Sequence, residues 1–271
     1  MKNITKNIIK FIADSNLWLA LATAFFYWLT LLQLEQKIDF SPTVIILFFS
    51  TLFTYTFFKT KYIQYKNIKL KWYVVGISFA VMLACIPFLS FNTLSVLAIG
   101  GVLSFFYATP MVRVGKNRFN FRKYWYLKSI IIALVWTLSC ATIPLLEFNA
   151  TKNQLIWFSL EKFLFILSIA LPYDIKDIAQ DSKPNGIKSF AMKFGISKTK
   201  WISNSILSIA FLLALWLYPN FYIALFITYS FAFFLNYKLN INTSFYWYTF
   251  LIDATIILYF CTFLVSSYFF M

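Results

Sequence analysis

The sequence predicts an all-helical, polytopic membrane protein, and three observations lead to that fold class. Hydrophobic residues make up 61% of the 271 residues. They come in continuous runs of about 17–22 residues, which is the length that a helix needs to cross a bilayer. Charged residues make up 12% of the chain, whereas a soluble domain holds about 25%. Because the runs are continuously apolar rather than alternating, helices are favoured over a barrel.

The apolar runs follow one another from the N-terminus to the C-terminus. The first run comes after a polar break at Asp14-Ser15-Asn16 and continues past small residues that resemble a signal-peptidase site, which favours a retained span over a cleaved signal. Prolines near the ends of later runs agree with helix boundaries, because a missing N–H is tolerated there. No linker, repeat or soluble domain is visible, so we expect one transmembrane domain over residues 1–271. The nine predicted spans are 17–34, 42–58, 72–90, 92–110, 127–146, 155–172, 201–218, 221–237 and 247–270.

The positive charges fall in alternate loops. Of the 24 basic residues, 21 lie in the N-terminus, in the stretches 59–71, 111–128 and 173–200, or at Lys238. The positive-inside rule then places the N-terminus and these loops in the cytoplasm and the C-terminus outside. We therefore expect an integral protein of a cell membrane, of the bacterial inner-membrane type. The charges assigned to the outer side are Lys37, Lys152, Lys162, Glu35, Asp39, Glu147 and Glu161.

Charge and composition also exclude several classes of function. The net charge of +15 follows the loops rather than an aromatic-interleaved patch, which argues against nucleic-acid binding. The chain has no histidine, so histidine-based metal, haem and general-base chemistry is excluded. Cys85, Cys140 and Cys261 lie singly in apolar runs, and this pattern predicts small buried side chains rather than ligands or disulfides.

Three of the nine acidic residues lie close together at the end of an apolar run. Asp174, Asp177 and Asp181 are three and four residues apart, which places their carboxylates on one face of a helix. Like charges at that spacing repel unless a cation lies among them. Mg²⁺ prefers carboxylate oxygens and commonly bridges to substrate phosphates. The pattern therefore predicts a magnesium site, and a solvated helix end is the alternative interpretation.

One further carboxylate lies inside a predicted span. Asp253 falls within 247–270, roughly two turns from its cytoplasmic end. A carboxylate in the membrane is costly and usually faces a cavity or a partner. We expect Asp253 either to line a central cavity or to pair with a tyrosine or serine of a neighbouring helix.

The stretch Tyr173-Asp-Ile-Lys-Asp-Ile-Ala-Gln-Asp181, with the later Gly186-Ile-Lys-Ser189 and Lys193-Phe-Gly195, resembles the second aspartate motif of the UbiA family of membrane prenyltransferases. Phe106-Tyr-Ala-Thr-Pro110 and the Tyr124-x-x-x-Lys128 element, followed by Ala133-Leu-Val-Trp136, extend the likeness. The resemblance implies nine helices around a central cavity. It also implies transfer of a prenyl group from an isoprenoid diphosphate to an aromatic or other lipid-pathway acceptor in the bilayer, with Mg²⁺ as the cofactor.

The same resemblance suggests roles for individual residues. Asp174, Asp177 and Asp181 fill the catalytic, metal-binding positions, and Lys128 matches the lysine that faces the diphosphate. For Arg113, an equal alternative is a loop charge that serves only to set the membrane orientation. For Tyr124, the alternative is an ordinary tyrosine at the membrane interface, where tyrosines are common. The full set of predicted diphosphate-binding residues is Lys128, Arg113, Lys188, Tyr124 and Lys59.

The sequence departs from the family pattern at the first aspartate motif. Thr56, Thr60 and Gln64 occupy the positions where the family has Asn and Asp, and Lys59 lies beside them. An uncharged oxygen binds Mg²⁺ far less well than a carboxylate, so our hypothesis is that Lys59 replaces a cation there. A noncatalytic isoprenoid-diphosphate-binding or partner-binding relative is the alternative. An ion-coupled transporter is disfavoured because the acidic triad lies at a helix end rather than at the midplane.

Overall fold

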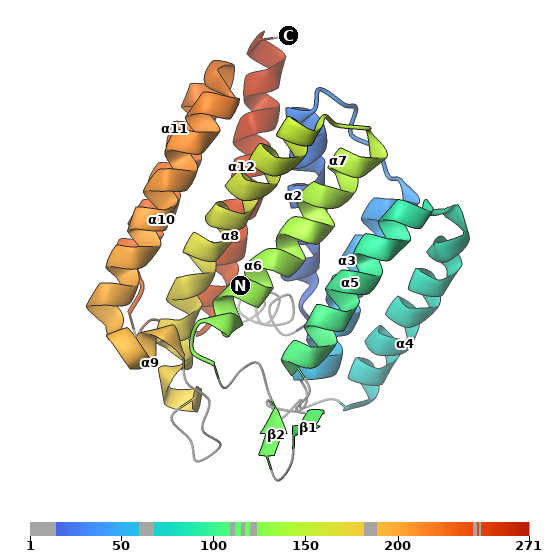
Figure 1. The fold of residues 1–271 in the computed structure, drawn as a ribbon, viewed down its shortest axis with the longest axis vertical. Coiled ribbons are helices and arrows are strands. Elements are labelled where there is room, and N and C mark those ends of the chain that lie inside the picture. The colour runs from blue at the N-terminus through green and yellow to red at the C-terminus, as the bar shows by residue number, and fades with distance from the viewer. Residues whose placement is uncertain are drawn as a thin grey trace, which may run out of the picture.

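In the computed structural model the chain is a bundle of long helices (Figure 1). The structure describes residues 15–59, 68–108, 112–114, 117–119, 124–181, 189–240, 243 and 245–270. The predicted all-helical fold is confirmed, with one short hairpin added. The helices are α2 (Leu17–Gln33), α3 (Pro42–Lys59), α4 (Ile68–Cys85), α5 (Phe91–Ala108), α6 (Leu127–Thr137), α7 (Ile143–Glu147), α8 (Lys152–Asp181), α9 (Phe190–Phe194), α10 (Ile196–Leu217), α11 (Tyr222–Lys238) and α12 (Phe245–Phe270).

Each of the nine predicted spans overlaps a helix of the structure. By length and hydropathy, six segments are able to cross a membrane, so the chain is an integral membrane protein. The apolar parts of α2, α3 and α5 are shorter, so the predicted count of nine crossings is not confirmed. The six long segments are Lys71–Phe88, Leu127–Glu147, Lys152–Lys176, Ile196–Leu217, Pro219–Lys238 and Phe250–Phe269.

The helices form a closed ring. Going around it, α2 contacts α3, α3 contacts α5, α5 contacts α6, and α6 contacts α8. The ring continues through α8, α10, α11 and α12, and α12 returns to α2. α4 packs against the outside of α3 (Figure 1). Because adjacent helices pack side by side around the ring, its interior is able to enclose a cavity.

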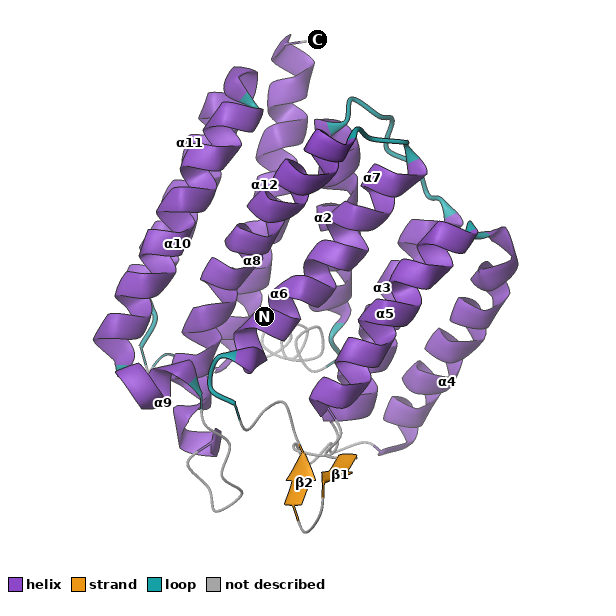
Figure 2. Ribbon diagram, viewed as in Figure 1, coloured by secondary structure: helices purple, strands orange, loops and turns teal. Residues whose placement is uncertain are grey.

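The two ends of the bundle differ. The links between α2 and α3 and between α7 and α8 lie at the end where the chain terminates (Figure 2). The opposite end carries α9 and a hairpin of β1 (Val112–Val114) and β2 (Asn117–Phe119), in which Arg113 is opposite Arg118. The hairpin and α9 belong to two of the loops that the charge pattern assigns to the cytoplasm. No strand was predicted there, because three-residue strands are too short to give a periodic pattern.

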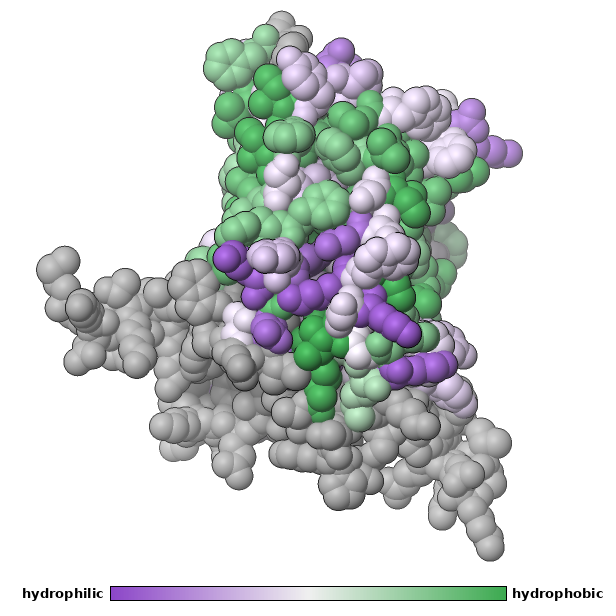
Figure 3. Space-filling view, turned by 90° about the vertical axis from the view of Figure 1, so that its left-hand side faces the viewer, coloured by the Kyte–Doolittle hydropathy of each residue, from purple (hydrophilic) through white to green (hydrophobic). Residues whose placement is uncertain are grey.

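The surface of the bundle is largely apolar. Figure 3 shows the face formed by α10 and α11, where hydrophobic side chains cover much of the surface above a hydrophilic zone. Leu212, Trp216 and Phe226 are exposed in the apolar part, and Lys198 and Lys238 are exposed where α10 begins and α11 ends. Lipid-facing side chains bordered by cationic and aromatic ones are typical of a membrane-spanning bundle.

Two prolines lie within helical segments rather than at their ends. Pro172 is inside α8, which continues to Asp181, past the predicted end of that span at 172. A proline lacks the N–H that would bond the carbonyl four residues earlier. The Ser203 hydroxyl of α10 donates instead to the Ser168 carbonyl, at 2.6 Å. α8 therefore crosses Pro172 and carries Asp174 to the end of the bundle.

The carbonyl left without a partner by the second proline also receives a hydrogen bond from a neighbouring helix. Pro144 follows a π-helical turn at Leu138–Thr142, which joins α6 to α7. The Thr30 hydroxyl of α2 donates to the Cys140 carbonyl at 2.7 Å. In a membrane, a freed backbone carbonyl needs such a donor because no water replaces it. The side chains of Ser139 and Cys140, from this π-helical turn, line the cavity described below.

Two charges that the sequence placed on the outer side are buried in the bundle, so that assignment is wrong. Glu161 and Lys162 lie within α8, both side chains are fully buried, and Nζ is 2.6 Å from Oε2. Tyr229 and Tyr259 donate hydrogen bonds to the other oxygen of Glu161, at 2.7 and 3.2 Å. The Lys162 ammonium lies 4.9 Å from the centre of the Tyr259 ring. These contacts therefore offset the free-energy cost of removing the two charges of Glu161 and Lys162 from water.

Another carboxylate, Glu147, connects helices at the end of the ring opposite to the hairpin. Glu147, at the end of α7, accepts hydrogen bonds from Tyr27 of α2 at 2.8 Å and from Thr43 of α3 at 2.6 Å. Thr93 of α5 donates to it at 2.9 Å. Four helices thus converge on one carboxylate at the end opposite to the hairpin. This arrangement holds α2, α3, α5 and α7 together at that end.

A candidate intramembrane active site

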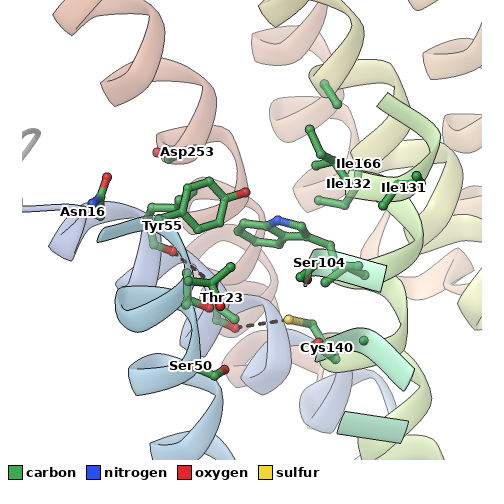
Figure 4. A pocket seen from close by; sticks show the side chains of 18 of the residues that line it. Asn16, Thr23, Ser50, Tyr55, Ser104, Ile131, Ile132, Cys140, Ile166 and Asp253 are labelled. Carbon is green, nitrogen blue, oxygen red and sulfur yellow. Dashed lines mark hydrogen bonds between the residues drawn. The ribbon is translucent and has the colours of Figure 1, made fainter. Parts of the chain in front are cut away.

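The ring encloses a cavity of about 580 Å³. Side chains of α2, α3, α5, α6, α8 and α12 line it, and Figure 4 shows part of this lining. Most of the walls are apolar, with a small number of polar groups, which is the usual composition of a small-molecule site. Along α6 and the π-helical turn that follows it, the lining extends from Lys128 to Cys140, about 18 Å at 1.5 Å per residue. The cavity is therefore deep enough to hold an extended hydrocarbon chain.

Lys128 and Asp174 form an ion pair that lines this cavity. The Lys128 Nζ is 3.1 Å from Asp174 Oδ1, and both side chains are almost completely buried. Ser129 donates to the other carboxylate oxygen at 3.2 Å. Lys128 and Ser129 belong to the first turn of α6, and Asp174 lies two residues after Pro172 of α8. The ends of two long helices thus bring the predicted lysine and the predicted aspartate together.

The short helix α9 contacts the same carboxylate. Ser189 caps α9 by accepting a hydrogen bond from the Met192 N–H at 3.3 Å. The Phe190 N–H of its first turn donates to Asp174 Oδ2 at 3.2 Å. Gly195, with φ 80° and ψ 166°, joins α9 to α10 in a conformation that is essentially restricted to glycine. The Ser and Gly of the second-motif resemblance therefore serve to place α9 against Asp174.

A second polar group lines the cavity on α12. Asp253 is 3% exposed, and the Tyr173 hydroxyl donates to its Oδ1 at 3.3 Å. Both expectations for Asp253 are therefore met, since it lines the cavity and also pairs with a tyrosine. Asn16 and Tyr55 line the same part of the cavity, as Figure 4 shows. The Asn16 amide donates to the Thr56 hydroxyl of α3 at 3.2 Å.

Several predicted site residues fall outside what the structure describes. Asp177 and Asp181 belong to α8 and Arg113 to β1, but their side chains are not described. Lys59 ends α3, and its side chain is likewise outside the description, as are the whole of Thr60, Gln64 and Lys188. Tyr124 precedes α6, is exposed, and is not among the residues that line the cavity. Its predicted contact with diphosphate stays a prediction.

The structure also identifies polar cavity residues that sequence reasoning missed. Asn16, Tyr55 and Lys176 line the cavity, and Ser129 binds Asp174. Lys176 lies inside the acidic motif and Ser129 beside Lys128, so proximity to a motif is a usable signal for these two. Tyr55 likewise lies beside Thr56 of the first-motif stretch. Asn16 carries no such signal, because its contact with Thr56 joins parts of the chain forty residues apart.

A hard divalent cation prefers carboxylate oxygens, and the Asp174 side chain, which lines the cavity, is one such donor. Asp177 and Asp181 follow it in α8, and a shared metal site of the three stays a prediction. Within the described part of the chain, no three His, Cys, Asp or Glu side chains are grouped for metal binding. That search does not include the side chains of Asp177 and Asp181.

Comparisons with known proteins identify the family and agree with the fold. The family model described as "UbiA prenyltransferase family" matches residues 67–253. The fold is similar to a solved structure of a digeranylgeranylglyceryl phosphate synthase, with a TM-score of 0.58 and 15% sequence identity. That similarity covers 98% of this chain and 99% of the other. A search of curated proteins gave no match.

Proposed function

Because this chain belongs to the UbiA prenyltransferase family, we propose that it transfers a prenyl group from an isoprenoid diphosphate to a lipophilic acceptor within the membrane. The acceptor is an aromatic compound or another lipid-pathway molecule. The observation that carries the proposal is the Lys128–Asp174 pair in the wall of a deep, mostly apolar cavity. A charged end next to an apolar interior matches a ligand that has a diphosphate head and a hydrocarbon tail.

The proposed reaction separates charge at the head of the substrate. The bond between C1 of the prenyl chain and the diphosphate oxygen breaks, and its electron pair leaves with the diphosphate. The acceptor supplies the electron pair for the new bond to C1 and then loses a proton. Lys128, already held at the cavity wall, stabilises the negative charge that develops on the leaving diphosphate.

Asp174, Asp177 and Asp181 are the residues that we propose to hold Mg²⁺. The cation would supply positive charge for the leaving diphosphate. Arg113, Lys188, Tyr124 and Lys59 remain predicted contributors to diphosphate binding. The apolar walls, including Ile131, exclude water from the prenyl chain and so protect a carbocation from hydrolysis.

We also propose an orientation in the membrane. The end with α9 and the hairpin faces the cytoplasm, and the end with Glu147 and the C-terminus faces outward, in a bacterial inner membrane. The distribution of basic residues over alternate loops supports this orientation. The diphosphate end of the cavity is then accessible to a substrate from the cytoplasm.

The test is Mg²⁺-dependent release of pyrophosphate from geranyl, farnesyl and longer diphosphates, with and without a panel of aromatic and lipid acceptors. Release is expected to need an acceptor and Mg²⁺, and to fall at least about 100-fold in an Asp174→Asn, Asp177→Asn double variant. Asp39→Asn is the control, because Asp39 is an exposed acid in the link between α2 and α3. Binding of the diphosphates without release under any of these conditions would favour the noncatalytic relative.

A further inference from the structure

Lysines gather where α10 begins and α11 ends, at the end of the bundle that carries α9 and the hairpin. Lys198 and Lys238 are exposed there, and Lys200 lies between them and the bundle as a half-buried side chain. We call these three residues the basic cluster. The sequence has no acidic residue between positions 182 and 252, so α9, α10 and α11 contain no carboxylate that could neutralise the cluster.

Hydrogen bonds hold the two helix ends together at the basic cluster. The Lys200 ammonium of α10 donates to the Tyr237 carbonyl of α11 at 2.8 Å. The Asn236 amide of α11 donates to two side chains of α10, at 2.8 and 3.0 Å. Lys198 lies two residues before Lys200, and Lys238 directly follows Tyr237. The contact therefore brings the two exposed lysines to the same part of the surface, while Lys200 itself is used to join the helices.

The basic cluster borders the apolar face of α10 and α11 that Figure 3 shows. The Lys238 ammonium lies 5.8 Å from the ring centres of Phe234 and Tyr237, and both rings are exposed. On α10 the exposed Trp201 follows Lys198 by three residues and so lies on the same side of the helix. Cations beside exposed aromatic rings, next to an apolar face, match the interface between lipid headgroups and acyl chains.

We propose that the basic cluster binds the headgroup of an anionic phospholipid whose acyl chains lie along α10 and α11. The ammonium groups attract the net negative charge of that headgroup, whereas a zwitterionic headgroup carries its own cation and gains less. The apolar face adds contacts that a water-soluble phosphate lacks. A second copy of this chain is a poor occupant, because a symmetric contact would bring the same lysines together. This inference is independent of the proposed prenyl transfer.

The experiment counts bound lipid. The full-length protein in detergent is titrated with phosphatidylglycerol or with phosphatidylcholine of the same acyl chains, and bound lipid is measured by native mass spectrometry. We expect tighter binding of phosphatidylglycerol. In a Lys198→Gln, Lys238→Gln variant its affinity should fall about 30-fold, or about 5-fold for each lysine, and that of phosphatidylcholine should not change. Lys37→Gln, Lys152→Gln is the matched control, because it removes two exposed lysines from the opposite end of the bundle.

A conservative variant separates loss of charge from loss of structure. Lys198→Arg, Lys238→Arg keeps both charges and should keep the wild-type affinity for phosphatidylglycerol. Equal affinity for the two lipids, or wild-type affinity in the glutamine variant, would overturn the proposal. Displacement of the lipid by an equal concentration of glycerol phosphate would overturn it too and would indicate a site for soluble phosphates. No prenyl substrate is present, so any of these results leaves the proposed function standing.

Discussion

The Glu161–Lys162 pair shows how single residues carry charge inside this bundle. The ammonium has one carboxylate oxygen at 2.6 Å and aromatic rings around it, among them Phe26 and Tyr218 at 5.6 Å from their centres. Glu161 uses its second oxygen for Tyr229 and Tyr259. Removing two charges from water is expensive, and such a pair is stable only when its remaining hydrogen-bonding capacity is used. The tyrosines and the ring faces provide that compensation.

Removing one charge of the Glu161–Lys162 pair should lower the free energy of unfolding more than neutralising both charges. Lys162→Met leaves Glu161 as an unpaired buried charge and is expected to lower the free energy of unfolding by about 3–5 kcal/mol. The Glu161→Gln, Lys162→Met double variant should lose less, since the glutamine still accepts from Tyr229 and Tyr259. Denaturant titration in detergent measures both values. Lys152→Met is the control, because Lys152 is exposed at the start of α8. A double variant at least as unstable as Lys162→Met would contradict this account.

At the scale of elements, the prolines and their hydroxyl donors decide how α8 and the α6–α7 segment continue. Ser203→Ala removes the donor to the Ser168 carbonyl and should destabilise the protein by about 1–3 kcal/mol, the cost of an unsatisfied buried group. In a Pro172→Ala background the same change should cost less, because the substituted alanine provides the missing N–H. Thermal unfolding of the four proteins completes the cycle. Ser205→Ala is the control, since the Ser205 hydroxyl donates within its own helix, to the Trp201 carbonyl. Equal losses in both backgrounds would show that Ser203 acts independently of Pro172.

The link between α9 and α10 allows a second test of how the helices are positioned. Gly195→Ala places a Cβ in a backbone conformation that costs about 1–3 kcal/mol for other residues, although no neighbouring atom lies within 4 Å of the new methyl group. The strain should also displace α9 from Asp174 and weaken binding of farnesyl thiolodiphosphate, an unreactive analogue. Gly76→Ala, in the middle of α4 with equal free space, should leave analogue binding unchanged and should not lower the melting temperature, because alanine favours a helix over glycine. Wild-type behaviour of Gly195→Ala would refute the role given to this glycine.

Elements with a continuous apolar run were predictable from sequence, and the others were not. The helices α10 and α11 begin and end within about five residues of their predicted ranges, as hydropathy changes sharply there. The nine residues of α8 after Pro172 are mostly polar and carry no hydropathy signal for a span, so the spacing of the aspartates was the only sign that they are helical. The π-helical turn depends on a hydroxyl of α2 more than one hundred residues away in sequence. Local patterns contain no information about such partners.

For the whole molecule, the ring and its two unlike ends make the orientation testable. In a cysteine-free background (Cys85→Ala, Cys140→Ala, Cys261→Ala), Lys37→Cys should react with an impermeant maleimide on intact cells. Lys198→Cys should react only after permeabilisation, because it lies at the end assigned to the cytoplasm. Both side chains are exposed, so burial does not confound the labelling. The reverse pattern would mean that the positive-inside rule fails for this chain.

The candidate site was predictable to the extent that its residues lie in motifs that the sequence shows. Lys128 and Asp174 were both expected, and the structure places them 3.1 Å apart. Asp253 was identified because a carboxylate in an apolar span is conspicuous. Asn16 was not, since its contact with Thr56 spans forty residues and depends on how α2 and α3 pack. A site assembled across a ring of helices is only partly encoded in local sequence.

The Pro172–Ser203 contact also limits the order in which the two residues are able to arise during evolution. A serine at 203 is tolerable beside an ordinary residue at 172, because its hydroxyl is able to bond a carbonyl of its own helix. A proline at 172 without that serine leaves a carbonyl unsatisfied in the membrane. The serine therefore has to come first, and once the proline is present the serine is no longer free to change. One hydrogen bond therefore constrains later substitution at two positions, and one of them, Pro172, lies two residues before Asp174 of the site.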